Sequence, residues 1–139
     1  MKMLALDLGD RWVGSATSDP LGITCKPYET TELHSLFSFL ELTLKKESIK
    51  TIVIGYPKTF SGTESEQTKK VVSIKESIDA FLQEKFPKTT CVLWDERLSS
   101  KRSQEAKQAR TPEEKRKSHS IAAAFILQSY LDFQAMQKE

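Results

Sequence analysis

A short, continuously apolar segment in the middle of the chain limits the folds that are open to it. Residues 51–55, Thr-Ile-Val-Ile-Gly, place three β-branched apolar side chains in a row. Such a run is typical of a β-strand that is covered on both faces, because a strand with one exposed face alternates apolar and polar residues. Residues 89–94, Thr-Thr-Cys-Val-Leu-Trp, form a second run that predicts a buried strand. The two runs predict a sheet with helices on both faces.

Helical periodicity surrounds these two segments. One apolar stripe at helical spacing follows Thr30 and Thr31, either of which can cap a helix, and consists of Leu33, Leu36, Phe37, Leu40 and Leu44. A second stripe, which Pro87 closes, consists of Val71, Ile74, Ile78, Phe81 and Leu82. From Ser99 the chain is expected to be helical twice, with a break at Thr111-Pro112 and an end near residue 135. Alternating helices and strands predict right-handed crossovers and parallel strands.

The amino-terminal segment predicts antiparallel strands, because its apolar segments are separated by tight turns and not by helices. Residues 3–8 and 12–18 are expected to form a hairpin around Gly9, and residues 23–26 a third antiparallel strand that Pro27 stops. The whole pattern predicts an α/β fold of the ribonuclease-H-like type. It would have a five-stranded mixed sheet, in which an antiparallel three-strand meander joins two parallel strands, with helices on both faces. A length of 139 residues fits one domain over 1–139.

Composition excludes several classes of protein. A chain with 38% hydrophobic and 29% charged residues, and only five glycines and five prolines, is expected to be globular and soluble. The isolated Cys25 and Cys91 are expected to be buried thiols and not ligands. The amino terminus lacks a signal-peptide core, and no run approaches the length of a membrane span. We therefore expect a cytoplasmic protein without a membrane partner.

Two acidic residues stand at predicted strand ends. Asp7 interrupts an apolar strand on the same face as Met3 and Ala5, so it is either a turn acid bonded to the amides that follow or a metal-binding carboxylate. Asp95 and Glu96 follow the strand that ends at Trp94, and successive side chains point in opposite directions, so one of them, for which we take Glu96, could face Asp7. Arg97 could clamp a phosphate oxygen or form an ion pair within this triplet.

Positive charge is concentrated in residues 97–117, which hold eight Lys or Arg against three Glu, although the whole chain carries only +2. Most charge runs are solvated helical surfaces. Next to the acidic candidates, however, this segment is also suited to bind a nucleic-acid backbone, mostly without reading bases, with an affinity that falls steeply with salt. The expected substrate-binding side chains are those of Arg11, Arg97, Lys101, Arg102, Lys115, Arg116 and Lys117.

Four motifs in the same order resemble one bacterial family. They are Asp7 to Gly14 with Thr17-Ser-Asp19, Gly55-Tyr-Pro57 with Gly62, Asp95-Glu-Arg-Leu-Ser-Ser100, and Lys115-Arg-Lys with Ile121-Ala-Ala123 leading into residues 126–131. This pattern is similar to the YqgF-type, Holliday-junction-resolvase-like family of pre-16S rRNA nucleases. The resemblance implies a metal-dependent endonuclease that matures the 5′ end of 16S rRNA, with a more debated role on branched DNA. It also implies that Asp7 and Glu96 are the metal-binding carboxylates.

Position 119 departs from that pattern, because the family usually has a third Asp there and this chain has His119. Ala122, Ala123 and Ile126 share a helical face with His119, and the small alanines would let that face approach the sheet at the Asp7 end. Imidazole can ligate a metal or carry a proton, but it brings no negative charge, which weakens Mg²⁺ binding and favours Mn²⁺. The alternative is a histidine with an ordinary structural role in a protein of reduced catalysis.

Two other functions remain open at this point. A nucleic-acid or ribosome-assembly protein could keep the fold and the basic segment without cleavage. A sugar-kinase or actin-like phosphotransferase also begins with an Asp-x-Gly hairpin, but it closes two lobes over its nucleotide, for which 139 residues are too few. Neither the choice between RNA and branched DNA nor that between a monomer and a weak homodimer follows from the sequence. Trp12 could stack on a base, although an aromatic residue at a strand start is more often part of the core.

Overall fold

A five-stranded mixed sheet forms the centre of the protein in our computed structural model, which describes residues 1–56, 66–95 and 112–137. The strand order is β3-β2-β1-β4-β5. The elements are β1 (Lys2–Leu8), β2 (Trp12–Ser18), β3 (Cys25–Glu32), the 3₁₀ turn η1 (Leu33–Ser35), α1 (Leu36–Lys46), β4 (Ile49–Tyr56), α2 (Glu66–Lys85), β5 (Thr90–Asp95) and α4 (Pro112–Gln137). β1, β2 and β3 pair antiparallel, whereas β4 pairs parallel with both β1 and β5. The predicted meander with two parallel strands is confirmed.

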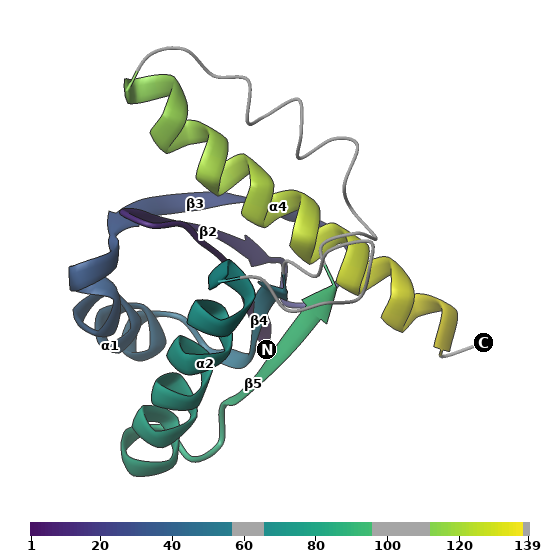
Figure 1. Cartoon of the computed structure of the whole chain (residues 1–139). Helices are drawn as coiled ribbons and strands as arrows, with labels where there is room; N and C mark the ends of the chain where they lie inside the picture. The colour runs from purple at the N-terminus through teal and green to yellow at the C-terminus, as the bar shows by residue number, and fades with distance from the viewer. Residues whose placement is uncertain (57–65, 96–111, 138–139) are drawn as a thin grey trace.

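Helices cover both faces of this sheet (Figure 1). The even-numbered leucines of β1, Leu4, Leu6 and Leu8, pack with α1 and α2 in one apolar cluster. Met3 and Ala5 point the other way and pack with α4 in a second cluster, which contains Ala123, Ile126 and Leu127. The alternation that divides β1 between two cores is the geometry of an extended strand, and it places Asp7 on the α4 face.

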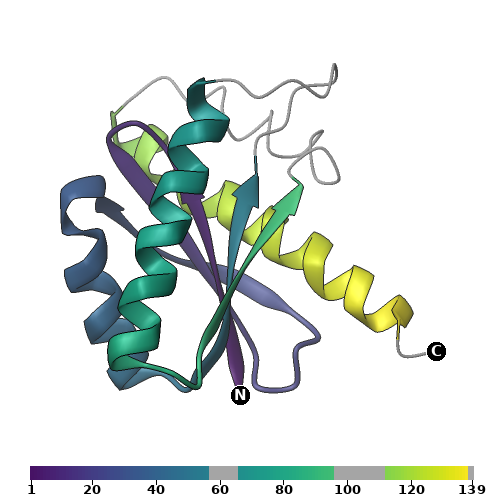
Figure 2. The same ribbon diagram turned by 60° about the horizontal axis from the view of Figure 1, so that its bottom comes forward.

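The carboxyl ends of β1, β4 and β5 lie at one end of the sheet, together with the first turns of α2 and α4 (Figure 2). This arrangement follows from the parallel pairing of β1, β4 and β5. Asp7 is the next-to-last residue of β1 and therefore belongs to this end. Open α/β sheets bind ligands at the carboxyl ends of their strands.

The third strand differs from its prediction. β3 does not stop before Pro27 but runs from Cys25 to Glu32, with Pro27 opposite Ala16. Proline is tolerated here because β3 is an edge strand, where a missing N–H group removes no bond inside the sheet. Thr30 and Thr31 consequently belong to this strand, and the prediction that one of them caps the next helix is wrong.

The first helix begins later than its apolar stripe suggested. The 3₁₀ turn η1 contains Leu33, and the buried stripe of α1 consists of Leu36, Phe39, Leu40, Thr43 and Leu44. Phe37 lies at the margin of this stripe and remains 39% exposed. Phe37 was therefore assigned wrongly to the buried stripe. It packs edge-on against Phe81 of α2, with ring centroids 5.4 Å apart.

The last helix agrees with its prediction, since α4 begins at Pro112 and ends at Gln137. The helix expected from Ser99 and the loop expected over residues 58–64 lie outside the described residues. Within the described ranges, no helix is long and apolar enough to cross a membrane.

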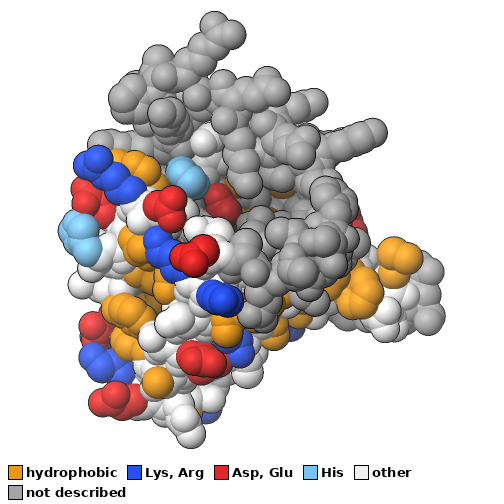
Figure 3. Space-filling model, in the orientation of Figure 1, with side chains coloured by type: hydrophobic (Ala, Val, Ile, Leu, Met, Phe, Trp, Pro, Cys, Tyr) orange, Lys and Arg blue, Asp and Glu red, His pale blue; other side chains and the backbone are white. Residues whose placement is uncertain are grey.

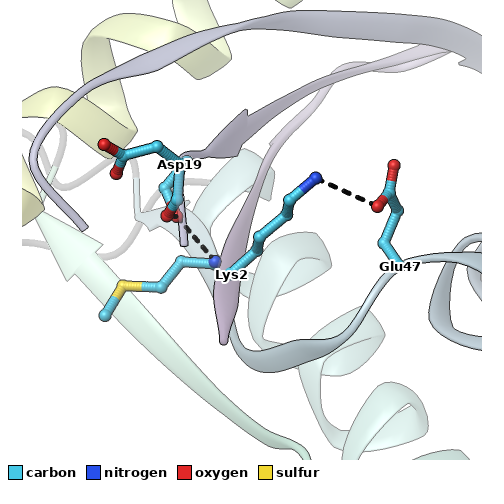
Figure 4. A network of polar contacts seen from close by, with 5 residues as sticks. Lys2, Asp19 and Glu47 are labelled. Atoms are coloured by element: carbon cyan, nitrogen blue, oxygen red, sulfur yellow. Dashed lines mark hydrogen bonds and ion pairs between the residues drawn. The ribbon is translucent and has the colours of Figure 1, made fainter. Parts of the chain in front are cut away.

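Polar contacts hold the start of β1, which lies at the opposite end of the sheet from Asp7 (Figure 4). The Lys2 ammonium lies 3.1 Å from a carboxylate oxygen of Glu47, and the Met3 N–H donates to the Ser18 hydroxyl at 2.8 Å. A cavity of about 350 Å³ opens here between Lys2 and Lys26. Because this cavity is at the amino end of β1, we do not assign it to the chemistry at Asp7.

Candidate active site at the carboxyl end of β1

The central contact of the site joins Asp7 of β1 to His119 of α4. The Nδ1 atom of His119 lies 3.0 Å from Oδ2 of Asp7, across 112 positions of the chain. The Asp7 side chain is only 8% exposed and that of His119 is 26% exposed. An ionised carboxylate only accepts hydrogen bonds, so Nδ1 donates to it, and a neutral imidazole in this contact has its lone pair on Nε2. The sequence-based expectation that α4 aims His119 at the Asp7 end agrees with this geometry.

Gly14 makes this contact possible, because it lies opposite Asp7 in the β1–β2 register and directly beneath α4. A Cβ atom at Gly14 would lie 2.0 Å from the carbonyl carbon of His119 and 2.4 Å from the backbone nitrogen of Ser120. The close approach was predicted from Ala122 and Ala123, which are indeed buried. The sequence reasoning missed that the strand contributes equally; the available signal was a glycine inside a strand, which often marks close backbone approach.

The start of α2 holds the turn between β1 and β2. The side-chain amide of Gln67 donates to the Leu8 carbonyl at 3.0 Å, and the Lys70 ammonium lies 3.2 Å from the Asp10 carboxylate. Within the turn, the Gly9 N–H donates to the Trp12 carbonyl at 2.9 Å. Gln67 and Lys70 were not identified from the sequence, because nothing in a polar helix start indicates which turn it contacts.

The predicted substrate-binding residues are only partly described. Arg11 is exposed, and its guanidinium carbon lies 5.2 Å from the centroid of the Trp12 ring; Lys117 is exposed on α4. Glu96, Arg97, Lys101 and Arg102 lie outside the described residues, as do the side chains of Lys115 and Arg116. Figure 3 shows histidine and charged side chains on this face of the molecule, beside the residues drawn in grey.

A divalent cation is compatible with the donors that are described. The Asp7 carboxylate supplies oxygen, which Mg²⁺ and Mn²⁺ both accept, and the imidazole of His119 supplies nitrogen, which suits Mn²⁺ better. In the part of the chain that the structure describes, no group of three or more His, Cys, Asp or Glu side chains could hold a metal ion. Of the three metal ligands expected from the sequence, Asp7 and His119 are the two that the structure describes.

The two cysteines lie away from this site. Cys91 is buried in the core beneath α2, and Cys25 is half-buried on β3, where its thiol donates to the Ala124 carbonyl at 3.1 Å. Burial raises the pKa of Cys25 to about 11, with a further contribution from the Asp132 carboxylate. Burial likewise raises the pKa of Cys91 to about 12.

Both thiols are therefore expected to react slowly with 5,5′-dithiobis(2-nitrobenzoate) in the folded protein. At pH 8 only about one Cys25 side chain in a thousand is a thiolate, whereas an unperturbed thiol with a pKa of about 8.5 is about one-quarter ionised. The thiolate fraction, and with it the rate, should rise about tenfold per pH unit between pH 8 and 10. Stopped-flow absorbance in buffer and in denaturant measures this difference, and equal rates in the two conditions would contradict it.

Comparison with known proteins places the chain in a family. Residues 1–133 match the family model described as "RuvX: Holliday junction resolvase". A Clostridium novyi protein named "Putative pre-16S rRNA nuclease" is 36% identical over 95% of this chain and 98% of its own length. A Caldicellulosiruptor bescii protein of the same name is 37% identical over 96% of this chain and 97% of its own length.

Solved structures agree on the fold. Thermus thermophilus RuvC in complex with a Holliday junction substrate has a TM-score of 0.61 at 11% identity, covering 98% of this chain and 96% of that chain. The fowlpox virus Holliday junction resolvase has a TM-score of 0.51 at 14% identity, covering 95% of this chain and 99% of that chain. At these identities the likeness concerns the fold, and it confirms the ribonuclease-H-like architecture. With the match over residues 1–133 and relatives above 35% identity, the chain belongs to the RuvX, Holliday junction resolvase-like family.

Proposed function

We propose that this protein is a divalent-cation-dependent endonuclease that cleaves phosphodiester bonds in nucleic acid and processes the 5′ end of precursor 16S rRNA. The observation that carries the proposal is the buried Asp7 carboxylate in contact with His119 at the carboxyl end of a central strand. The names of the full-length relatives support the choice of precursor rRNA. We further propose that residues 1–139 act as a single domain, as a monomer or weak homodimer in the cytoplasm.

The proposed ligands of the cation are Asp7, Glu96 and His119. Side chains of β5 alternate between the two cores, with Val92 and Trp94 packed on the α4 face. Glu96 has the same parity in the sequence, so continuing the alternation supports Glu96, and not Asp95, as the partner of Asp7. A bound Mg²⁺ or Mn²⁺ would stabilise the negative charge on the phosphate and lower the pKa of the attacking water.

The residues of the chain have separate roles in this proposal. Asp7 orients the imidazole of His119 through Nδ1, so that Nε2 is presented either as a ligand or as a proton acceptor. Arg11 and Lys117 are exposed cations on the described surface and are suited to contact phosphates. No side chain needs to form a covalent intermediate. Affinity should fall steeply with salt, because each phosphate contact releases counterions.

The test uses the whole chain with three substrates: precursor 16S rRNA, mature 16S rRNA and a four-way DNA junction. We expect cleavage of the precursor near its 5′ end with Mn²⁺ or Mg²⁺, and none after chelation with EDTA. Cleavage that persists in EDTA would contradict the metal dependence. Cleavage of the junction without cleavage of the precursor would instead identify a resolvase of branched DNA.

A second candidate is a nucleic-acid or ribosome-assembly protein with weakened or absent catalysis. The contact that favours it is the same one, since one oxygen of Asp7 is already engaged by the imidazole of His119. At the position where the family pattern has a third acidic residue, this chain has a side chain that brings no negative charge.

His119→Asp separates the two candidates. If position 119 belongs to the metal shell, the substitution should raise the affinity for Mg²⁺ roughly tenfold and increase the rate of cleavage in Mg²⁺. Without metal, the new carboxylate would lie beside Asp7, and mutual repulsion should lower the melting temperature until Mg²⁺ is added. Melting curves against Mg²⁺ concentration measure this directly.

The matched control is His34→Asp, since His34 is an exposed histidine in η1. His34 contacts the carboxylate of Glu32, so His34→Asp also places two acidic side chains next to each other, but away from Asp7. Its melting temperature should not depend on Mg²⁺, and its cleavage rate should equal that of the wild type. If His119→Asp behaves like this control, position 119 lies outside the metal shell.

A further inference from the structure

We propose that Trp12 and Arg11 form a platform that stacks one unpaired base beside the cleavage site, so that the protein selects single-stranded over paired nucleic acid. The proposal rests on the proposed nuclease function and names the substrate class of that same site. It starts from an aromatic side chain that neither apolar core includes.

The position of Trp12 follows from the hairpin. Gly14 pairs with Asp7, and Trp12 lies two residues further along β2, which is about 7 Å in an extended strand. Side chains two apart in a strand share a face, so Trp12 lies on the α4 face, as Gly14 and Asp7 do. The hydrogen bond from the Gly9 N–H to the Trp12 carbonyl holds this end of β2 against the end of β1. Trp12 is therefore fixed next to the Asp7–His119 contact.

The other tryptophan shows what a structural role looks like in this protein. Trp94 packs in the α4-face core, with its ring centroid 5.3 Å from Tyr130 and 5.0 Å from Phe133, and its indole N–H donates to Ser129 at 3.1 Å. Trp12 is instead half-buried, beside the exposed Asp10 and Arg11. Trp12 is thus partly accessible to solvent at the end of the sheet where substrate would bind.

Arg11 gives the platform its second component. Its guanidinium carbon lies over the Trp12 ring at 5.2 Å from the centroid, a cation–π arrangement. A planar aromatic ring with a cation on it suits a nucleotide, since the indole can stack on a base and the guanidinium can bind the adjoining phosphate. The flat face of a base is available for such stacking only when the base is not enclosed in a helix. The pair therefore favours an unpaired nucleotide next to the bond to be cut.

The test measures binding separately from cleavage. The probes are a ten-nucleotide oligoadenylate and an abasic strand with the same number of phosphates, titrated without metal into the Asp7→Asn variant. We expect the oligoadenylate, but not the abasic strand, to quench tryptophan emission, and we expect Trp12→Phe in the same background to remove the quenching. Trp12→Leu, which keeps an apolar side chain without an aromatic face, should weaken oligoadenylate binding about tenfold and leave abasic-strand binding unchanged.

Phe37→Ala is the control, because Phe37 is a partly exposed aromatic on α1, on the opposite face of the sheet. It should leave binding of both strands unchanged.

The platform is refuted if Trp12→Leu weakens binding of both strands equally, or weakens binding of neither. It is also refuted if a blunt RNA duplex quenches tryptophan emission as strongly as the single strand does. The nuclease proposal fails independently, if the wild type quenches on oligoadenylate but cleaves nothing in Mn²⁺. If Trp12→Leu cleaves normally and binds oligoadenylate as the wild type does, only the platform is refuted, and the nuclease proposal stands.

Discussion

Asp7→Asn is expected to lower the rate of cleavage at least about 100-fold while the protein remains folded. The substitution keeps the shape of the side chain, and the amide oxygen can still accept the hydrogen bond from Nδ1 of His119. It removes the negative charge that would bind the cation, and the loss of such electrostatic stabilisation typically costs a factor of about 100 to 1,000. Multiple-turnover cleavage of precursor rRNA in Mn²⁺, together with a melting curve, measures both effects.

The stability of Asp7→Asn should lie within about 1 kcal/mol of the wild type. A buried charge is costly to desolvate, so the neutral amide offsets the hydrogen-bond energy that it loses. Asp10→Asn is the control from the same turn. Its side chain is 90% exposed and its ion pair with Lys70 is at the surface, so cleavage should change less than about twofold. Equal losses in the two variants would show that Asp7 has no special role.

Gly14→Ala is expected to have the largest effect on stability, about 3 kcal/mol or more. The added Cβ would overlap the backbone of His119, at 2.0 Å from its carbonyl carbon and 2.1 Å from its carbonyl oxygen. Backbone atoms cannot move aside as the end of a flexible side chain can, so α4 must shift away from the sheet. The packing between α4 and β2 is then lost in part, which destabilises the fold. The shift also separates His119 from Asp7, so that any residual folded protein should cleave poorly. Urea denaturation measures the loss of stability.

Gly22→Ala is the matched control for that substitution. A Cβ at Gly22 meets only a side-chain carbon of Leu131 at 3.9 Å, but the backbone there has φ of 71°. The cost should be the backbone strain alone, about 1 kcal/mol, with cleavage unaffected. If Gly14→Ala costs no more than Gly22→Ala, the contact between β2 and α4 is looser than we describe.

Much of the fold follows from hydrophobic pattern. The run at residues 51–55 and the stripe at 71–82 each predict one element, because burial on both faces and burial on one helical face leave different periodicities. The prediction failed where tertiary context overrides local signals. Pro27 is compatible with a strand only at the edge of a sheet. The residues around Pro27 do not reveal that β3 is an edge strand, because the strand order depends on the whole fold. Phe37 likewise has helical spacing from Leu33, Leu40 and Leu44, but it lies at the margin of the buried face of α1, where it packs on Phe81 and stays partly exposed.

The site was predictable in part. The apolar surroundings of Asp7 singled it out, since a carboxylate in a buried strand needs a partner. The approach of His119 could be expected from the small side chains on its helix face, but the distance depends on Gly14, which lies more than 100 positions away in the sequence. The contacts of Gln67 and Lys70 could not be predicted, because long polar side chains reach their partners only once the helix and the turn are both in place.

Pro27 also bears on how copies of this protein can associate. β3 forms one margin of the sheet. A strand from another molecule would pair with this margin through main-chain hydrogen bonds, for which β3 would have to present an unbroken row of N–H donors. The proline ring leaves a gap in that row, flanked by the charged side chains of Lys26 and Glu29. We therefore expect this margin to resist growth into a continuous intermolecular sheet, the kind of pairing on which fibrous aggregates are built.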